Sequence, residues 1–380
     1  MNLHLFIDPL GYYSSQFAAR VNRIDPLHNT IVNISIPKVK HEHILYFDGY
    51  KKDLKKYLNE LSDIKRVYYH FYTPTFARIN HNLKKRIPKI TSVWAFWGGD
   101  FFSLPEFQES KFMTFSKNNG MDTTWLPRSS KLRQIAVDIF YGLQGKIPYN
   151  HKRFIESIRE IDVLAVYFRK DYEIIVKYCG HQMQYVKFPY LSLDLILGDS
   201  MYDEPHNPGS VIMVGHSADP GLNHFEILEQ LDKLHCTSKI LVPVNYGKEN
   251  YRIKLQEASR AFKLNIEFLT EYLPLKEYNH KLREVGHAIF NVNHQQAFGN
   301  IITLIWFGVK VFLHPDSSIY SELKEQGFVL FSVQEIESLE VFSPLSEAEK
   351  TKNRELLKKI LSPEIADEMN LNLLKIEKNL

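Results

Sequence analysis

The sequence predicts an α/β protein in which two doubly wound, parallel-sheet domains face each other across a cleft. Three observations support this fold class. Short runs that are apolar throughout alternate with helical patterns along both halves of the chain, as expected for parallel strands covered on both faces. A polar stretch with two glycines and two prolines, residues 195–209, interrupts the series. The length of 380 residues allows two or three domains.

The order of these runs gives the domain organisation. Domains are expected at residues 1–194 and 210–345, joined by the linker 195–209 and followed by charged helices over 346–380. In the first domain we expect strands at 3–8, 30–35, 66–71, 91–96, 162–168 and 184–188, with helices at 53–61 and 75–83. In the second we expect strands at 210–214, 239–244, 266–268, 287–292 and 309–313. The helices between them are expected at 225–234, 251–262, 275–285 and 300–307.

Charge divides the chain in the same way. Residues 1–190 carry a net charge of +11 and residues 191–380 a net charge of −8. A basic half suits acidic lipid head groups or an anionic substrate, although a solvated basic surface better explains any single lysine. The basic clusters at 51–56 and 84–86 are expected to be exposed helix faces. The overall charge of only +3 gives no reason to expect nucleic acid.

Targeting signals and cysteines point to the cytoplasm. The chain starts without a basic segment followed by a long apolar one, so no signal peptide is expected. Its two cysteines suit a reducing compartment. The uncharged run 285–309 has polar residues in its middle, which disfavours a membrane span.

The loop 294–300 is the first candidate binding site, because it joins a strand to an apolar and therefore buried helix. Gly299 lets a backbone approach a ligand, and Asn300 is expected to cap the helix. The free N–H groups at such a helix start attract anions, and Gln295 and Gln296 add neutral donors suited to a diphosphate. The alternative is an ordinary capped helix start.

Two more loops follow strands of the same predicted sheet. The first contains Gly215, Ser217 and Asp219, whose backbone and hydroxyl groups can surround a phosphate. Its alternative is a long turn in which Asp219 caps a helix. In the second loop, Glu271 can accept ribose hydroxyls or belong to a capping box. Neither a Walker loop nor a dinucleotide fingerprint is present.

The first domain offers a possible general base at two strand ends. Asp100 follows Trp97 and Gly98 after one strand, and His70 ends another. Either could take a proton from an acceptor hydroxyl, although a histidine among aromatics is more often a core residue. Arg169 and Asp171 follow a third strand.

Other patterns bear on metals and membranes. No Asp-x-Asp motif and no cysteine–histidine cluster occurs, so neither a metal site nor a cofactor is expected. Residues 132–143 form an amphipathic helical pattern flanked by basic residues. This segment could lie in a membrane interface or pack on the domain core.

Taken in order, these motifs resemble a known family over residues 70–331. The elements are Tyr-Tyr-His ending at His70, Trp97-Gly98-x-Asp100, Arg169-x-Asp171, Gly215-x-Ser217-x-Asp219 with His224, Tyr246, Glu271, and Gln295-Gln296-x-x-Gly299. They are similar to the TDP-N-acetylfucosamine:lipid II N-acetylfucosaminyltransferases, also called the 4-alpha-L-fucosyltransferase family. The family has Asn, Gly and Arg where His216, Ala218 and His294 stand.

The resemblance implies a GT-B architecture of two Rossmann-like domains. It implies transfer of an amino-deoxy sugar from a dTDP donor to an undecaprenyl-diphosphate-linked saccharide at the cytoplasmic membrane face, as in enterobacterial common antigen or O-antigen synthesis. The second domain would bind the dTDP- or UDP-linked donor through Gly215, Ser217, Asp219, Tyr246, Glu271, His294, Gln295, Gln296, Gly299 and Asn300. Trp97, Gly98, Arg169 and Asp171 would lie on the acceptor side.

The sequence thus predicts a metal-independent glycosyltransferase, peripheral on the inner face of the cell membrane, with Asp100 the first candidate base and His70 the second. Two alternatives stay open. One is a sugar-nucleotide epimerase or hydrolase on the same fold, and the other is a non-catalytic, transferase-like scaffold.

Overall fold

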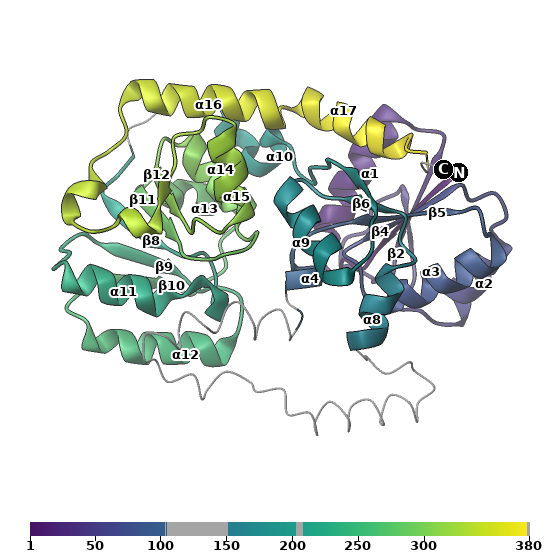
Figure 1. The fold of residues 1–380 in the computed structure, drawn as a ribbon, viewed down its shortest axis with the longest axis horizontal. Coiled ribbons are helices and arrows are strands. Elements are labelled where there is room, and N and C mark those ends of the chain that lie inside the picture. Colours follow the sequence, from purple (N-terminus) through teal and green to yellow (C-terminus); the bar gives the residue numbers. More distant parts are fainter. Residues whose placement is uncertain (103, 105–150, 203–207, 378–380) are drawn as a thin grey trace. The chain divides into compact units, whose positions relative to one another are not determined.

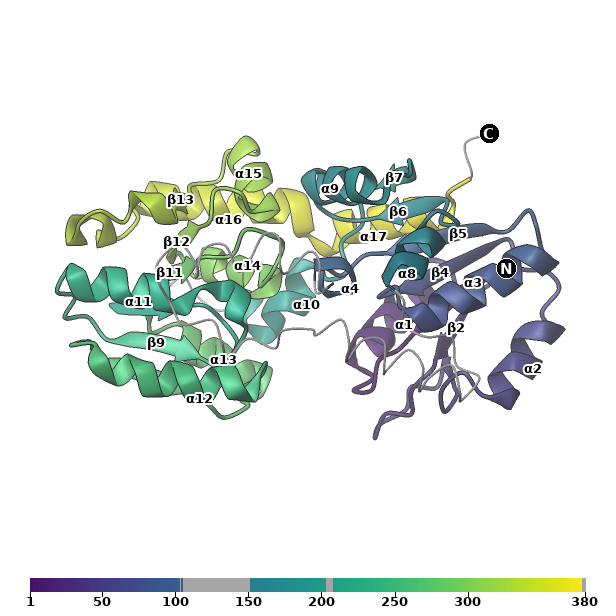
Figure 2. The ribbon, with the colours of Figure 1, turned by 60° about the horizontal axis from the view of Figure 1, so that its bottom comes forward.

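A computed structural model describes residues 1–102, 104, 151–202 and 208–377. Contacts divide these residues into two compact units (Figures 1 and 2). Unit 1 comprises the described residues up to Tyr190 together with Glu364 onward, and unit 2 runs from Leu191 to Pro363. The amphipathic segment 132–143 lies outside the described residues.

Unit 1 is built on a parallel sheet of seven strands in the order β3-β2-β1-β4-β5-β6-β7. The strands are β1 (Asn2–Phe6), β2 (Asn29–Asn33), β3 (Ile44–Tyr46), β4 (Arg66–His70), β5 (Thr91–Ala95), β6 (Val163–Ala165) and β7 (Gln184–Val186). The helices are α1 (Tyr12–Ile24), α2 (Lys52–Glu60), α3 (Pro74–Arg86), α4 (Gly99–Phe102), α8 (His151–Ile158), α9 (Arg169–Cys179) and α17 (Pro363–Leu374).

Unit 2 repeats this design with six parallel strands in the order β10-β9-β8-β11-β12-β13. Its strands are β8 (Val211–Val214), β9 (Ile240–Pro243), β10 (Ile266–Leu269), β11 (Val285–Phe290), β12 (Lys310–Leu313) and β13 (Phe331–Ser332). The helices are α10 (Leu193–Leu197), α11 (His224–Lys233), α12 (Glu249–Ala258), α13 (Leu275–Leu282), α14 (Phe298–Trp306), α15 (Ser318–Glu325) and α16 (Glu347–Leu361), with short 3-10 turns η1 (Gly198–Tyr202) to η5 (Leu339–Phe342).

Burial explains why these apolar runs form parallel strands. Strands β1, β5, β8, β9, β11 and β12 are buried at every position, so both faces must be covered. In unit 1, α1 and α17 cover one face, with Phe17, Val21 and Leu373 in the core. In unit 2, α11 and α12 cover one face, with Leu228 and Leu255 in the core; Figure 1 shows both helices on the same side of that sheet.

The order of strands places a switch point in each sheet. From β1 the chain proceeds to β2 on one side, whereas β4 leads to β5 on the other. In unit 2, β8 and β11 are the equivalent central pair. Loops at the carboxyl ends of such a pair turn to opposite faces and leave a crevice, where open α/β sheets bind ligands.

The division of the chain differs from the predicted one at two places. The predicted linker 195–209 begins inside α10 and includes η1, both in unit 2. Ile196 and Leu197 are buried there, and the Leu197 carbonyl accepts a hydrogen bond from Asn279 at 3.1 Å, so this part is packed structure. The helical tail is also divided, because α16 belongs to unit 2 and α17 to unit 1.

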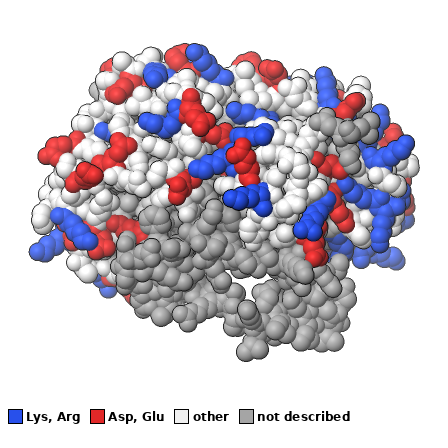
Figure 3. Space-filling view, in the orientation of Figure 1, with Lys and Arg blue, Asp and Glu red and all other residues white. Residues whose placement is uncertain are grey.

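No helix in the described part of the chain is long and apolar enough to cross a membrane. The uncharged run 285–309 forms β11, a loop and α14 instead. The basic surface expected in the first half is visible around α2 and α3, where lysine and arginine outnumber acidic side chains (Figure 3).

Candidate functional site

The candidate site in unit 2 lies at the carboxyl ends of β8 and β11. Two of the predicted loops meet there, because the Gln296 side-chain amide donates a hydrogen bond to Asp219 Oδ2 at 3.3 Å. Asn223 also reaches across, donating to the Asn291 carbonyl at 2.9 Å. The expected neighbourhood of these loops is therefore present in the structure.

The loop after β8 is fixed by a glycine with a left-handed backbone. Gly215 has φ +67°, and a Cβ at this position would lie 2.3 Å from His224 Nε2. The His224 ring is buried, and its Nδ1 contacts the Tyr251 hydroxyl at 2.8 Å. Gly215 is thus required by close packing, and the side on which a side chain would stand is filled by protein.

Asp219 has the capping role that the sequence offered as an alternative, and it also receives a side chain from the loop before α14. Its Oδ1 accepts a hydrogen bond from the Gly221 amide at 2.8 Å and caps the 3-10 turn η2 (Pro220–Leu222), as the alternative predicted. Its Oδ2 is the atom that receives Gln296. Ser217, two residues earlier, is 2% exposed.

The start of α14 differs from the prediction in one respect. The helix begins at Phe298, and Ala297 is its N-cap with φ +64°. Asn300 therefore lies in the first turn and does not cap the helix; the expectation was wrong because the cap is three residues earlier, at Ala297. A methyl group cannot accept a hydrogen bond from the first turn. The rest of the prediction holds, since Ile301, Ile302, Leu304 and Ile305 are at most 1% exposed.

Gly299 occupies the first turn of α14 with open space on its side-chain side. No heavy atom lies within 4 Å of the position where a Cβ would stand. A helix start without a side-chain acceptor at its N-cap, and with room for close approach, can bind an anion. His294, Gln295 and Gln296 lead into it and are partly buried.

His216 is a member of this site that the loop reasoning had not assigned. It is 4% exposed, and its Nδ1 has no hydrogen-bond partner among the described residues. Its ring lies 5.9 Å from Tyr246 and 6.2 Å from Phe290. Burial lowers the pKa of His216 to about 3, and burial together with the neighbouring His216 lowers the pKa of His294 to about 3.

Two further predicted residues lie on the next strands. The Tyr246 carbonyl accepts a hydrogen bond from the Ala218 amide at 2.7 Å, which ties the loop after β9 to the loop after β8. The Tyr246 side chain is 52% exposed. Glu271 lies exposed after β10, two strands from β8, and shows no capping role for α13.

One pair of polar residues escaped the sequence analysis. Glu226, in the first turn of α11, accepts a hydrogen bond from Asn291 Nδ2 at 2.9 Å. Burial raises the pKa of Glu226 to about 7, although the Asn291 bond opposes this. The only sequence signal was a polar residue, Asn291, directly after an apolar strand.

In unit 1, Asp100 is buried and holds three N–H donors. Its Oδ2 accepts from Trp94 Nε1 at 2.6 Å and from the Tyr72 amide at 3.1 Å, and its Oδ1 accepts from the Trp97 amide at 3.1 Å. Burial raises its pKa to about 6, with the hydrogen bonds from Trp94, Trp97 and Tyr72 opposing the shift. Asp100 thus ties together the ends of β4 and β5.

His70 lies in the core, as the alternative had predicted. It is 1% exposed, stacks on Phe6 at 3.8 Å, contacts His4 Nδ1 through Nε2 at 3.2 Å and meets the Tyr190 hydroxyl through Nδ1. Burial, with His4 beside it, holds its pKa well below the usual value. Both ring nitrogens are engaged within the protein.

The remaining acceptor-side residues follow strands β5 and β6. Arg169 begins α9, pairs with Glu173 at 3.3 Å and covers the Tyr172 ring at 4.7 Å, while Asp171 is fully buried. Trp97 and Gly98 lie directly before α4, next to Asp100. In the described residues, no group of three or more His, Cys, Asp or Glu could hold a metal ion.

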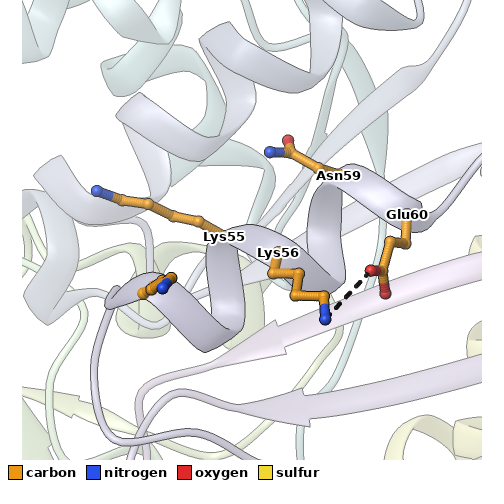
Figure 4. Close-up of a pocket in the computed structure, with 5 residues that line it drawn as sticks. Lys55, Lys56, Asn59 and Glu60 are labelled. Atoms are coloured by element: carbon orange, nitrogen blue, oxygen red, sulfur yellow. Dashed lines mark ion pairs between the residues drawn. The ribbon is translucent and has the colours of Figure 1, made fainter.

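A depression on unit 1 lies outside these loops. It has a volume of 540 Å³ and is lined only by α2, through Lys52, Lys55, Lys56, Asn59 and Glu60 (Figure 4). Lys56 and Glu60 pair at 3.9 Å on this exposed face. The lysine cluster is thus the exposed helix face that the sequence predicted.

Comparison with known proteins gives a family match and similar solved structures. The family model described as 4-alpha-L-fucosyltransferase, glycosyl transferase group 56, matches residues 184–355. Sucrose-phosphate synthase from Thermosynechococcus elongatus is similar in structure, with TM-score 0.62, 8% identity and 98% of each chain covered. The trehalose 6-phosphate synthase of Burkholderia multivorans gives TM-score 0.62 at 9% identity, covering 98% of this chain and 96% of the other.

A third similar structure is Anabaena HepE in complex with UDP and glucose, with TM-score 0.60, 11% identity and 99% of each chain covered. At these identities the likeness shows the fold, which is GT-B. The resemblance seen in the sequence motifs and the predicted fold class are both confirmed. Residues 184–355 match the model of the 4-alpha-L-fucosyltransferase family, glycosyl transferase group 56, and the chain is a glycosyltransferase with the GT-B fold.

Proposed function

We propose that this glycosyltransferase moves an amino-deoxy sugar from a dTDP- or UDP-linked donor to an undecaprenyl-diphosphate-linked saccharide at the cytoplasmic membrane face. The observation that carries the donor half is the meeting of two loops at the β8–β11 switch point. There the Gln296–Asp219 hydrogen bond joins two loops beside a helix start whose N-cap is Ala297. A diphosphate is the ligand that such a helix start suits.

Donor binding would use groups from both loops. The first-turn N–H groups of α14 and the amides of Gln295 and Gln296 donate to the diphosphate oxygens, and Gly299 gives them room to approach. Gln296 must then leave Asp219 or share its two N–H groups between Asp219 and the ligand. Tyr246, exposed beside this loop, and Glu271 are the candidates for the nucleoside.

The transfer step needs a base and a stabilised leaving group. The acceptor hydroxyl oxygen forms a bond to the anomeric carbon while the bond from that carbon to the diphosphate oxygen breaks. The nucleoside diphosphate leaves with the electron pair, and the hydroxyl proton passes to the base. Helix and side-chain donors at the α14 start stabilise the departing charge.

Asp100 stays the first candidate base, ahead of His70. With a pKa raised to about 6, Asp100 is ionised at neutral pH and more basic than an ordinary carboxylate. His70 has both ring nitrogens engaged in the core. Turnover by Asp100→Asn, with the true donor and acceptor, should fall at least a hundredfold while nucleotide affinity stays within twofold. Normal turnover by this variant would remove the assignment.

A panel of nucleotides tests the donor site directly. dTDP, UDP and their sugar conjugates should raise the melting temperature of the protein, because ligands of the native state stabilise it. Gln296→Glu should weaken nucleotide binding at least tenfold, since it places a second negative charge beside Asp219 and the diphosphate. The exposed Gln334→Glu in the same unit is the matched control and should change nothing.

The same panel separates the two alternatives. A scaffold without donor binding predicts no shift with any nucleotide. An epimerase or hydrolase predicts conversion of the nucleotide sugar in the absence of any acceptor. Either result would overturn the transferase proposal.

A further inference from the structure

A cluster of aromatic side chains lies at the switch point of unit 1. Tyr12 and Tyr13 begin α1 after β1, Phe71 follows β4, and Trp97 follows β5. The ring centroids of Tyr12 and Tyr13 are 5.2 Å apart, those of Tyr13 and Trp97 are 4.3 Å apart, and those of Phe71 and Trp97 are 6.3 Å apart. All three pairs are edge-to-face, so the four rings form one continuous patch, which we call the aromatic platform.

From this patch we infer that the aromatic platform binds a sugar ring of the acceptor saccharide. The inference rests on the proposed function, and it assigns a role to Tyr12, Tyr13 and Phe71 as well as to Trp97. Its position is that of a binding site, because the platform spans the loops that follow β1 and β4, the central pair of the sheet.

Three of the four platform rings are partly exposed, and the fourth is anchored on the protein. Tyr12, Tyr13 and Phe71 are 41%, 36% and 36% exposed. Trp97 is more buried and contacts Tyr190 at a centroid distance of 4.1 Å. Contiguous exposed apolar surface on a protein marks an interaction site more often than scattered exposed residues do.

Backbone strain supports a function for Phe71 in particular. Its φ is +68°, a conformation that glycine adopts at little cost and a bulky residue avoids. The strained turn is held by the Phe71 amide bonded to the Ala95 carbonyl at 3.2 Å and by the Tyr72 amide bonded to Asp100 at 3.1 Å. Gly99 leaves room for the ring, since a Cβ there would stand 3.3 Å from it. Strain of this kind is kept where it serves a site.

The chemistry of the platform selects a saccharide. A pyranose ring has a face of C–H groups that packs on aromatic rings and a rim of hydroxyls that needs polar partners. Two of the four platform residues are tyrosines, whose hydroxyls provide such partners next to an apolar surface. A polyprenyl chain needs apolar surface alone, so phenol hydroxyls at the exposed positions suit it less well.

The adjacent loop argues against a diphosphate on the platform. Asp8 lies in the loop between β1 and α1 and is buried. Its carboxylate already accepts the amides of Gly11 at 3.0 Å and Ser14 at 2.9 Å. The N-terminus of α1 therefore holds the protein's own negative charge, which favours a neutral ligand beside it.

Saturation-transfer NMR with methyl glycosides of N-acetylhexosamines tests the inference without an identified acceptor. Ring C–H protons should receive saturation from the wild-type protein, and the effect should fall at least fivefold in Tyr12→Ala and in Phe71→Gly. Glycine suits the backbone at position 71, so this variant removes the ring and relieves the strain. Tyr178→Ala, which removes a 40% exposed tyrosine from α9 of the same unit, is the matched control and should behave like the wild type.

Two results would overturn the inference. One is equal saturation of the glycosides by all four proteins. The other is loss of farnesyl diphosphate binding in the platform variants with glycoside binding unchanged, which would make the patch a lipid site. Binding of dTDP and UDP is measured on the same proteins and should stay within twofold. A protein that binds glycosides but no nucleotide would contradict the proposed function and leave the platform in place.

Discussion

The two units use the same sheet design, but α1 in unit 1 and α14 in unit 2, each following a central strand, begin in opposite ways. Helix α1 follows β1 in unit 1, and there Asp8 accepts the amides of Gly11 and Ser14. Helix α14 follows β11 in unit 2, and there the N-cap is Ala297, which has no acceptor. A helix start that holds its own carboxylate does not need an external anion, whereas one without an acceptor does. Under the proposed function, this difference assigns the charged donor to unit 2 and the neutral acceptor sugar to unit 1.

The largest expected effect comes from two glycines, one in each unit, that share a left-handed backbone but differ in their surroundings. Gly215→Ala in unit 2 should cost about 4 kcal/mol of unfolding free energy, because the new Cβ meets His224 Nε2 and the left-handed φ disfavours alanine. Gly180 in unit 1 has φ +59°, and no heavy atom lies within 4 Å of the position where a Cβ would stand. Gly180→Ala should therefore cost about 1 kcal/mol of unfolding free energy. Urea unfolding measures both, and equal costs would refute the packing argument.

The second test uses pH. The pKa of Asp100 is raised to about 6, so its contribution to stability is full below about pH 4 and is lost as the pH rises through 6. The loss is about 3 kcal/mol, which follows from raising the pKa of a buried carboxyl from its ordinary value to about 6. Asp100→Asn should abolish this part of the pH dependence of the unfolding free energy.

His216 in unit 2 should respond in the opposite direction. Because burial lowers its pKa to about 3, its contribution is present above pH 6.5 and is lost as the pH falls toward 3. His216→Asn should therefore make the protein less sensitive to acid. Urea unfolding between pH 4 and 7 gives the pH dependence of the unfolding free energy for Asp100→Asn and His216→Asn. If this dependence matched the wild type in both variants, the burial argument would be contradicted.

The third test removes the Asp8 carboxylate at the start of α1. Asp8→Ala should cost about 2 kcal/mol of unfolding free energy, because the amides of Gly11 and Ser14 lose their acceptor. Asp8→Asn keeps an acceptor oxygen and should cost less. Nucleotide affinity should be unchanged in both variants. A weakened affinity would mean that α1 takes part in donor binding.

The smallest effects concern the basic face of α2. Lys52→Glu combined with Lys55→Glu should change stability by less than about 0.5 kcal/mol, because both side chains are exposed. Binding to vesicles with anionic lipid should fall about fivefold or more at low salt and be weak for all proteins at high salt. Lys263→Glu on unit 2 is the control. Unchanged vesicle binding by the double variant would exclude α2 as the membrane-facing surface.

The sequence predicted the sheets well because buried parallel strands are apolar throughout. It missed β3 and β13, which have three and two residues and lie at sheet edges. The proximity of Asp219 and Gln296 followed from strand ends meeting at one edge. The start of α14 did not, because the left-handed Ala297 closes the loop before the expected cap.

The limits of the prediction are clearest for contacts between distant residues. His70 is engaged by His4 and Tyr190, which lie 66 and 120 residues away in the chain, so its burial depended on the whole fold. Glu226 and Asn291 are 65 residues apart. The aromatic platform likewise needs the loops of three strands, and no single stretch of sequence contains it.

The C-terminal helix α17 has a consequence for how the protein is made. Leu373, Leu374 and Ile376 fill the core of unit 1, where the Tyr68 hydroxyl bonds the Leu373 carbonyl and Asn2 bonds the Leu374 carbonyl. The core of unit 1 is therefore completed only after the intervening residues of unit 2 have been synthesised. Until then the sheet face that α1 shares with α17 is only partly covered, and apolar surface exposed in a nascent chain favours aggregation.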